Sequence, residues 1–149
     1  MGIEEEIKQS KFESEYNKLI VNILFTSSWL NCKQTRLFKQ HNISPRQYNV
    51  LRILSGKHPI PASITTITQR MIDKNSNASR IVDKLLEKKL VVRKKGEEDR
   101  RQKQVSISDK GLKLLDKMDE KMNEFEKQFH SLSVNEARQL NELLDKLRD

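Results

Sequence analysis

The segment from Arg93 to Ile107, RKKGEEDRRQKQVSI, constrains the fold of this chain more than any other stretch. Basic residues flank three acidic residues in its middle, and its last residues alternate between polar and apolar. A disordered basic tail has no need of Val105 and Ile107, and a fully buried hairpin would not carry so many charges. We therefore expect a structure that packs through its base and exposes a charged tip.

Two short strands are predicted on either side of this tip, in the segments LVVRKK and KQVSIS. Val91, Val105 and Ile107 are their apolar anchors, and Gly96 lies in the loop between them, where the chain can turn. The segment is therefore predicted to form a β-hairpin with a packed base.

The basic residues are concentrated in the same part of the chain. The formal net charge of the whole chain is +8, and residues 70–103 hold 12 Lys or Arg against 6 Asp or Glu. Residues 42–69 add +3, whereas residues 1–41 carry +1 and residues 105–149 carry −2. A localised basic patch on a folded domain is the electrostatic footprint of a polyanion such as nucleic acid, and the alternative is a solvated lysine-rich surface.

Apolar residues at three- and four-residue steps predict the helices. Residues 4–40 contain no Pro or Gly and read as one long helix. A second helix is expected to begin with Ser44 as its N-cap and Pro45 in the first helical position, and to end at Gly56. The segment KHPIPA then reads as an extended connection.

Two short helices joined by a polar turn are predicted before the hairpin. The segment SITTITQRMI turns Ile64, Ile67 and Met71 inward, and NASRIVDKLLEKKL separates an apolar side from a stripe of Arg80, Lys84 and Lys88. This pair is a helix-turn-helix candidate, and a hairpin directly after it makes a winged helix. Two further helices follow, one from about Ser108 and one that opens with a capping box of Ser133 and Glu136.

The stretch SRIVDKLLEKKLVVRKKGEEDRRQKQVSISDKG resembles the recognition helix, wing and following helix start of the MarR family of bacterial transcription regulators. Its most specific part is the tip EEDRR followed by VSISDKG. The resemblance runs from Ser44 to about Leu115, and helices of suitable length extend it to nearly the whole chain. It implies a sequence-specific regulator of double-stranded DNA, in particular a repressor released by a small-molecule ligand.

The resemblance also implies a homodimer that reads a pseudo-palindromic operator. The predicted fold is mainly α with a small β-hairpin wing: residues 43–107 would form the winged helix-turn-helix lobe, and residues 1–42 and 108–149 the helical dimerisation layer. Apolar stripes at both ends support a dimer, because a lone chain of 149 residues has few other elements to cover them. The alternative is an intramolecular bundle of the same helices.

The resemblance assigns DNA contacts to the start of the recognition helix and to the wing. Short polar side chains at a helix start reach base edges and phosphates, and Ser76 and Asn77 would also cap the helix. In the wing, the Asp99 carboxylate would hold Arg101 ready to enter the minor groove. The alternative for the wing lysines is an exposed charged hairpin. The full predicted set is Ser76, Asn77, Ser79, Arg80, Lys84, Lys94, Lys95, Asp99, Arg100, Arg101 and Lys103.

Two positions depart from the pattern of that family. Lys89 stands where the family often has Gly, so either a left-handed lysine or a different helix ending is expected. The segment TITQRM lacks the usual Leu-Ala pair. Both departures concern the geometry of the lobe.

Effector sites are suggested by single residues. Trp29, Tyr48 and Arg52 would line a cleft for a small aromatic or anionic effector, although such aromatic residues are more often core. Cys32, the single cysteine, is a candidate redox sensor, and its alternative is a small half-buried helix residue.

Other chemistry is not suggested by the sequence. The three histidines are scattered, and no nucleotide-binding or metal-binding motif is present, so neither an enzyme nor a metal or other cofactor is expected. No run approaches the roughly 18 apolar residues of a membrane span, and a cytoplasmic protein with no membrane partner is expected. A second class of function stays open, a winged helix that binds an acidic protein partner, because Glu97 and Glu98 at the wing tip would repel phosphate.

Overall fold

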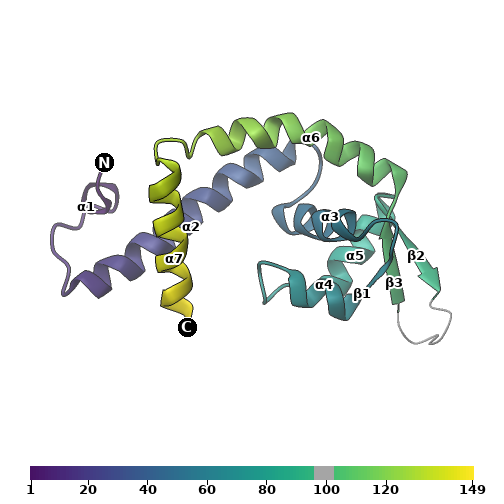
Figure 1. The fold of residues 1–149 in the computed structure, drawn as a ribbon, viewed down its shortest axis with the longest axis horizontal. Helices are drawn as coiled ribbons and strands as arrows, with labels where there is room; N and C mark the ends of the chain where they lie inside the picture. Colours follow the sequence, from purple (N-terminus) through teal and green to yellow (C-terminus); the bar gives the residue numbers. More distant parts are fainter. Residues whose placement is uncertain (96–102) are drawn as a thin grey trace.

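The computed structural model describes residues 1–95 and 103–149. Figure 1 shows a lobe built from the central elements, an arm built from the two ends of the chain, and α6 running above both. The elements in chain order are α1 (Ile3–Glu6), α2 (Glu15–Lys39), α3 (Pro45–Lys57), β1 (Ala62–Ser63), α4 (Ile64–Arg70), α5 (Ala78–Glu87), β2 (Val91–Lys95), β3 (Lys103–Ile107), α6 (Asp109–Lys127) and α7 (Val134–Arg148). The predicted fold class, mainly helical with a small winged sheet, is confirmed.

The sheet has three antiparallel strands in the order β1–β3–β2. The predicted hairpin is present: Val91 pairs with Ile107 at its base, and Lys95 pairs with Lys103 at its far end. The prediction of an extended connection over KHPIPA was wrong for its first part, a turn in which the Ile60 N–H donates to the Lys57 carbonyl at 2.7 Å. Its last residue, Ala62, belongs to β1 and pairs with Val105, which was not predicted. A two-residue strand has no alternation that a sequence could display, and only its pairing with β3 defines it.

The prediction of a single helix over residues 4–40 was also wrong. Helix α1 ends at Glu6, and α2 begins at Glu15 with Ser14 as its N-cap, whose hydroxyl accepts the Asn17 backbone N–H at 3.1 Å. Residues 7–14 carry only two large apolar side chains, so this stretch has no stripe to bury. An ion pair between Glu4 and Lys18 holds α1 against α2.

The caps predicted for the later helices are confirmed. Ser44 and Gln47 form a capping box with Pro45 in the first turn of α3, although α3 ends at Lys57 and not at Gly56. Ser108 caps α6. Ser133 and Glu136 form the capping box of α7.

The core lies inside the lobe, where the inward sides of α3, α4, α5 and the sheet meet the end of α2 and the first half of α6. Its most deeply buried side chains are Phe38, Val50, Leu51, Leu54, Ile67, Met71, Val82, Leu85, Val91, Val105 and Met118. The inward set predicted for α4 is confirmed, since Ile67 and Met71 are buried and Ile64 packs against the core.

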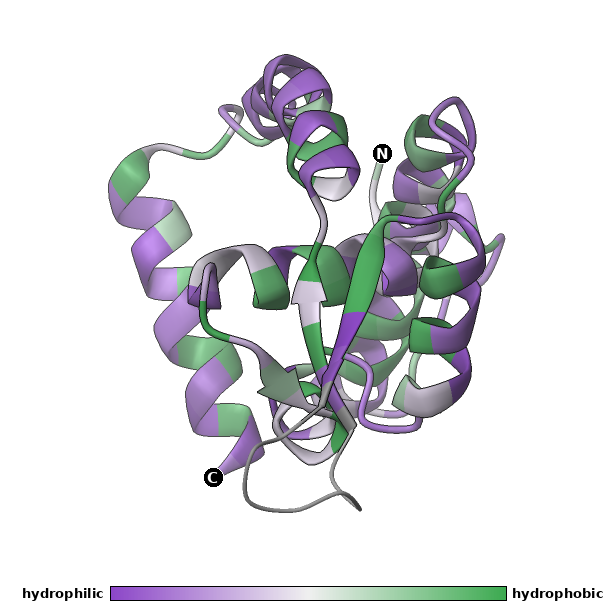
Figure 2. Ribbon diagram, turned by 90° about the vertical axis from the view of Figure 1, so that its right-hand side faces the viewer, coloured by the Kyte–Doolittle hydropathy of each residue, from purple (hydrophilic) through white to green (hydrophobic). Residues whose placement is uncertain are grey.

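The arm leaves large apolar side chains in contact with solvent. Helix α7 buries none of its residues, and Figure 2 shows hydrophobic stretches along it where it stands apart from the lobe. The most exposed large apolar residues of α2 and α7 are Tyr16, Ile20, Leu24, Val134, Leu143 and Leu147. Monomeric proteins rarely expose such continuous apolar surface. Within the described ranges 1–95 and 103–149, no helix is both long and apolar enough to cross a membrane.

Lys89 adopts the left-handed conformation, with φ of 59°. The Leu90 backbone N–H donates to the Leu85 carbonyl at 3.0 Å, and the Lys89 N–H donates to the Leu86 carbonyl at 3.0 Å. This pair of bonds is a Schellman ending, which favours glycine at the left-handed position. Of the two outcomes expected for Lys89, the structure therefore shows the left-handed lysine.

Gly111, in the first turn of α6, lets that helix approach the end of α5 closely. A Cβ atom placed there would lie 2.3 Å from the Leu90 carbonyl oxygen and 2.6 Å from Cγ1 of Ile107. Ser108 reinforces the same junction, because its hydroxyl donates to the Lys89 carbonyl at 2.7 Å.

The Lys89→Gly variant should have a free energy of unfolding about 0.5–1 kcal/mol higher than that of the wild type, because glycine adopts the left-handed conformation without the Cβ clash. Urea denaturation followed by circular dichroism, at fixed protein concentration, measures this difference. Lys89→Ala keeps the Cβ atom and should match the wild type; equal stabilisation by both variants would contradict the explanation.

The Gly111→Ala variant should lose roughly 1–3 kcal/mol of unfolding free energy, because the new methyl group meets backbone that cannot move freely. Gly56→Ala is the matched control, since a Cβ atom at Gly56 meets nothing within 4 Å. Because residue 56 is helical, Gly56→Ala should raise the free energy of unfolding by about 0.5–1 kcal/mol in the same urea titration. The interpretation fails if Gly111→Ala is neutral.

Candidate nucleic-acid interface

Helix α5 is anchored by one side and exposed on the other. Ala78, Val82 and Leu85 are buried in the core, whereas Arg80 and Lys84 are exposed. The Asn77 side chain caps the helix by accepting the Arg80 backbone N–H at 3.1 Å. The buried apolar side therefore determines which side chains α5 presents to a partner. The N-terminus of α5 favours the binding of an anion.

The turn before α5 is tied to α3. The Arg46 guanidinium binds the Asp73 carboxylate, with Nη2 at 2.5 Å and Nε at 2.9 Å from Oδ2. The backbone N–H of Asn75, and after it Arg46, lowers the pKa of Asp73 below its ordinary value. Asn49 of α3 accepts the Ile72 backbone N–H at 3.0 Å. These contacts fix the position of the α5 N-terminus relative to α3.

Sequence reasoning did not single out Arg46, Asn49 or Asp73. The one available signal was an acidic residue in a turn rich in capping groups. A side chain on α3 that reaches the turn more than twenty residues later cannot be inferred from periodicity, because it depends on how the two helices pack.

The predicted contact residues in the first part of α5 lie together at one end of that helix. Ser76 and Ser79 are half-buried, and Asn77, Arg80 and Lys84 are exposed. The predicted capping role of Asn77 is confirmed by its bond to Arg80. The same role predicted for Ser76 was wrong, because its buried hydroxyl has no hydrogen-bond partner among the described residues.

The wing is connected to α5 by an ion pair. Arg93 of β2 pairs with Asp83 of α5 at 2.8 Å, and Lys94, the following residue of β2, is exposed. Lys95 and Lys103 form the last described pair of the hairpin backbone. The predicted contacts Asp99, Arg100 and Arg101 lie outside the described residues, as do Gly96, Glu97 and Glu98.

Lys88, the third residue of the predicted stripe, is bonded within the protein. Its ammonium group donates to the Asn42 carbonyl at 2.5 Å and to Oε1 of Gln47 at 3.0 Å. Lys88 is the C-cap of α5. It joins the end of α5 to the start of α3.

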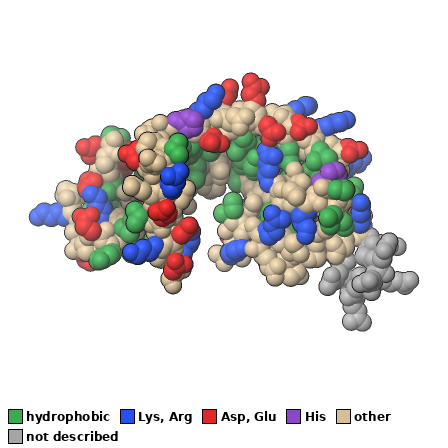
Figure 3. All heavy atoms as spheres, viewed as in Figure 1, with side chains coloured by type: hydrophobic (Ala, Val, Ile, Leu, Met, Phe, Trp, Pro, Cys, Tyr) green, Lys and Arg blue, Asp and Glu red, His purple; other side chains and the backbone are tan. Residues whose placement is uncertain are grey.

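Basic side chains gather over the lower half of the lobe in the view of Figure 3, whereas acidic side chains line α6 above. The lower half carries α4 and α5, and the wing projects beside it (Figure 1). A basic surface next to an exposed helix start is suited to a phosphate backbone.

The three residues predicted for an effector cleft are not all brought together. Arg52 donates from Nε to the Tyr48 hydroxyl at 2.7 Å and pairs with Asp119 of α6 at 2.5 Å. Burial opposes the charge of Arg52, but the hydrogen bonds to Asp119 and Tyr48 outweigh it and raise the pKa of this guanidinium. Trp29 lies roughly 13 Å along α2 from Phe38, the stacking partner of Tyr48, and packs edge-on against Phe129.

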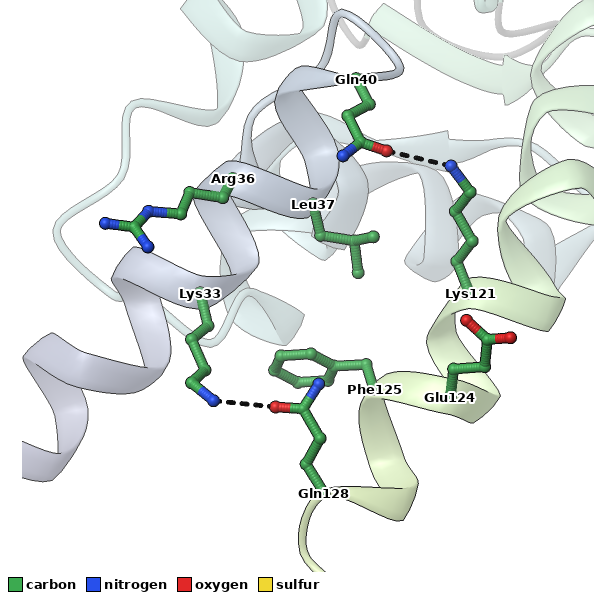
Figure 4. Close-up of a pocket in the computed structure, with 8 residues that line it drawn as sticks. All are labelled: Lys33, Arg36, Leu37, Gln40, Lys121, Glu124, Phe125 and Gln128. Atoms are coloured by element: carbon green, nitrogen blue, oxygen red, sulfur yellow. Dashed lines mark hydrogen bonds between the residues drawn. The ribbon is translucent and has the colours of Figure 1, made fainter.

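A separate groove lies between α2 and α6, with a volume of about 460 Å³. Figure 4 shows Lys33 bonded to Gln128, Lys121 bonded to Gln40, and Phe125 between the helices. Glu124 also lines this groove, and none of the three predicted cleft residues does. Cys32, also on α2, is exposed and not half-buried.

Comparisons with known proteins agree on one family. The model of the MarR family matches residues 43–103. The HTH-type transcriptional regulator YpoP of Bacillus subtilis (strain 168) is 32% identical over 106 residues, which cover 70% of this chain and 74% of YpoP.

Solved structures share the same fold. A MarR transcription factor from Planctomyces limnophilus is 29% identical with a TM-score of 0.69, and the match covers 91% of this chain and 98% of that one. MepR of S. aureus, solved in complex with DNA, is 23% identical with a TM-score of 0.75 and coverage of 92% and 97%.

Proposed function

The chain belongs to the MarR family of DNA-binding transcriptional regulators, and we propose that it acts as a homodimeric repressor that binds a pseudo-palindromic operator. The observation that carries this proposal is the exposed N-terminal half of α5, held by its buried apolar side and adjacent to the most basic part of the chain. Two such helices in a two-fold dimer would enter successive major grooves about one helical turn apart.

The arm supports the dimer. Helix α7 has no buried residue in the single chain, yet Leu140, Leu143 and Leu147 recur on it at helical spacing. These leucines and the exposed apolar residues of α2 would be covered by the same surfaces of a second copy. Residues 1–42 and 108–149 would then form the dimerisation layer, and residues 43–107 the DNA-binding lobe.

Release by a ligand would act through the contact between the lobe and α6. Arg52 of α3 and Asp119 of α6 form an ion pair, and Tyr48 lies against the same guanidinium. A small anionic or aromatic effector would compete with Asp119 for Arg52 and so alter the angle of the lobe.

Replacing Arg80 with Ala should weaken binding to the operator by roughly 1–3 kcal/mol, because this side chain is exposed at the start of α5. Fluorescence anisotropy with the chain's own upstream DNA measures the affinity. Arg101→Ala should produce a loss of the same size if the wing tip enters the minor groove. Arg36→Ala removes the same charge from α2 and should leave the affinity unchanged.

Salt and competitor DNA separate specific reading from charge alone. Affinity should fall steeply as salt rises, since phosphate contacts release counterions. Binding that is insensitive to salt, or equal on unrelated DNA, would contradict the proposal. The protein-interaction function would be favoured instead if no DNA is retained while an acidic protein is.

The Leu143→Glu variant should shift the protein from dimer to monomer, because a charge would be buried in the proposed interface. Sedimentation velocity at micromolar concentration reports the mass. Ile72→Glu is the control: Ile72 is 86% exposed on the lobe, against 63% for Leu143, and should leave the dimer intact. A wild-type protein that sediments as a monomer would rule out the dimer.

A further inference from the structure

A second hollow, here called the lysine hollow, lies where the end of α2, the end of α5 and the first half of α6 meet. Its volume is about 540 Å³. Four lysines line it, Lys88, Lys110, Lys113 and Lys117, and among the residues that the structure describes no acidic side chain lines it. The α2–α6 groove differs, because Glu124 lines it and its two lysines are bonded to glutamine side chains.

Two of the four lysines are held by the protein and two are not. Lys88 donates to Asn42 and Gln47, and Lys110 donates to the Lys88 carbonyl at 2.9 Å. In the part of the chain that the structure describes, Lys113 and Lys117 have no hydrogen bond or ion pair from their side chains. They lie one turn apart on α6, both exposed, so their ammonium groups are available to one anion.

His41 adds a polar atom to the same wall. Its Nε2 atom is buried and has no hydrogen-bond partner among residues 1–95 and 103–149. Burial, followed by the charges of Lys121 and Lys117, lowers the pKa of His41, so the neutral imidazole is favoured.

Asn42 and two leucines complete the lining. Leu90 is buried and Leu114 is half-buried. A site with some apolar lining and several cations is suited to an organic molecule that carries more than one negative charge.

We propose that the lysine hollow binds a phosphate-bearing small molecule of about nucleotide size. Lysine is a common phosphate ligand, and Lys113 and Lys117, which have no acceptor among the described residues, match a group with two or more charges. The volume lies within the range of about 300–1,000 Å³ typical of small-molecule sites.

The hollow is separate from the DNA-reading end of α5. Lys88 closes the C-terminus of this helix, whereas Asn77 caps its N-terminus, roughly 16 Å away along the axis. An anion in the hollow therefore does not occupy the proposed DNA surface, and its binding can be measured without DNA.

Titration of the full chain with ADP, pyrophosphate and adenosine tests the proposal by calorimetry and by ¹H–¹⁵N NMR. ADP and pyrophosphate should bind saturably and adenosine should not, because the phosphate groups supply the charge. The amides of His41, Leu90 and Leu114 should shift, and the pKa of His41 should rise on binding.

The double variant Lys113→Gln/Lys117→Gln should weaken ADP binding at least tenfold while its circular dichroism and thermal melting stay unchanged. Lys11→Gln/Lys127→Gln removes two exposed charges elsewhere and should bind as the wild type does. The proposal is overturned by the absence of saturable binding up to 10 mM, by equal loss in both variants, or by shifts confined to Arg80 and Lys84. Binding of only long polyanions such as heparin would overturn it as well.

Discussion

Burial of one side of α5 is the constraint on which the rest of the structure depends. Ala78, Val82 and Leu85 are inserted between α3, α4 and the sheet, so the opposite face and the helix N-terminus must point outward. The Schellman ending at Lys89 and the close approach of Gly111 then direct the chain into β2 and lock α6 over the end of α5. A DNA-reading helix needs this rigidity, because base contacts depend on a fixed register.

The basic residues in and next to the lobe differ in what their side chains bind. Lys88 donates to the Asn42 carbonyl, Lys110 donates to the Lys88 carbonyl, and both hold adjoining segments together. Arg46 and Arg93 pair with carboxylates and fix the turn and the wing relative to α3 and α5. Arg80, Lys84 and Lys94 remain exposed. The net charge alone therefore overstates how many cations can meet a polyanion.

The contrast between arm and lobe supports the proposed dimer. The lobe closes its own core, whereas α7 leaves its leucines exposed in a single chain. Apolar burial contributes about 25 cal/mol for each Å² removed from water, so covering the arm with a second copy would stabilise it substantially. The family membership and the exposed stripes lead to the same expectation by independent routes.

Local chemistry was readable from the sequence: the caps at Ser44 and Ser133 and the apolar side of α5 depend on neighbours within a few residues, and the hairpin is one continuous segment. Tertiary packing alone decided the strand β1, the bonds of the Lys88 ammonium group and the pair of Arg46 with Asp73. Each of these depends on a partner distant in sequence, which periodicity does not specify. The candidate DNA residues on α5 followed from the helical pattern and the family resemblance, but which lysines stay free followed only from the fold.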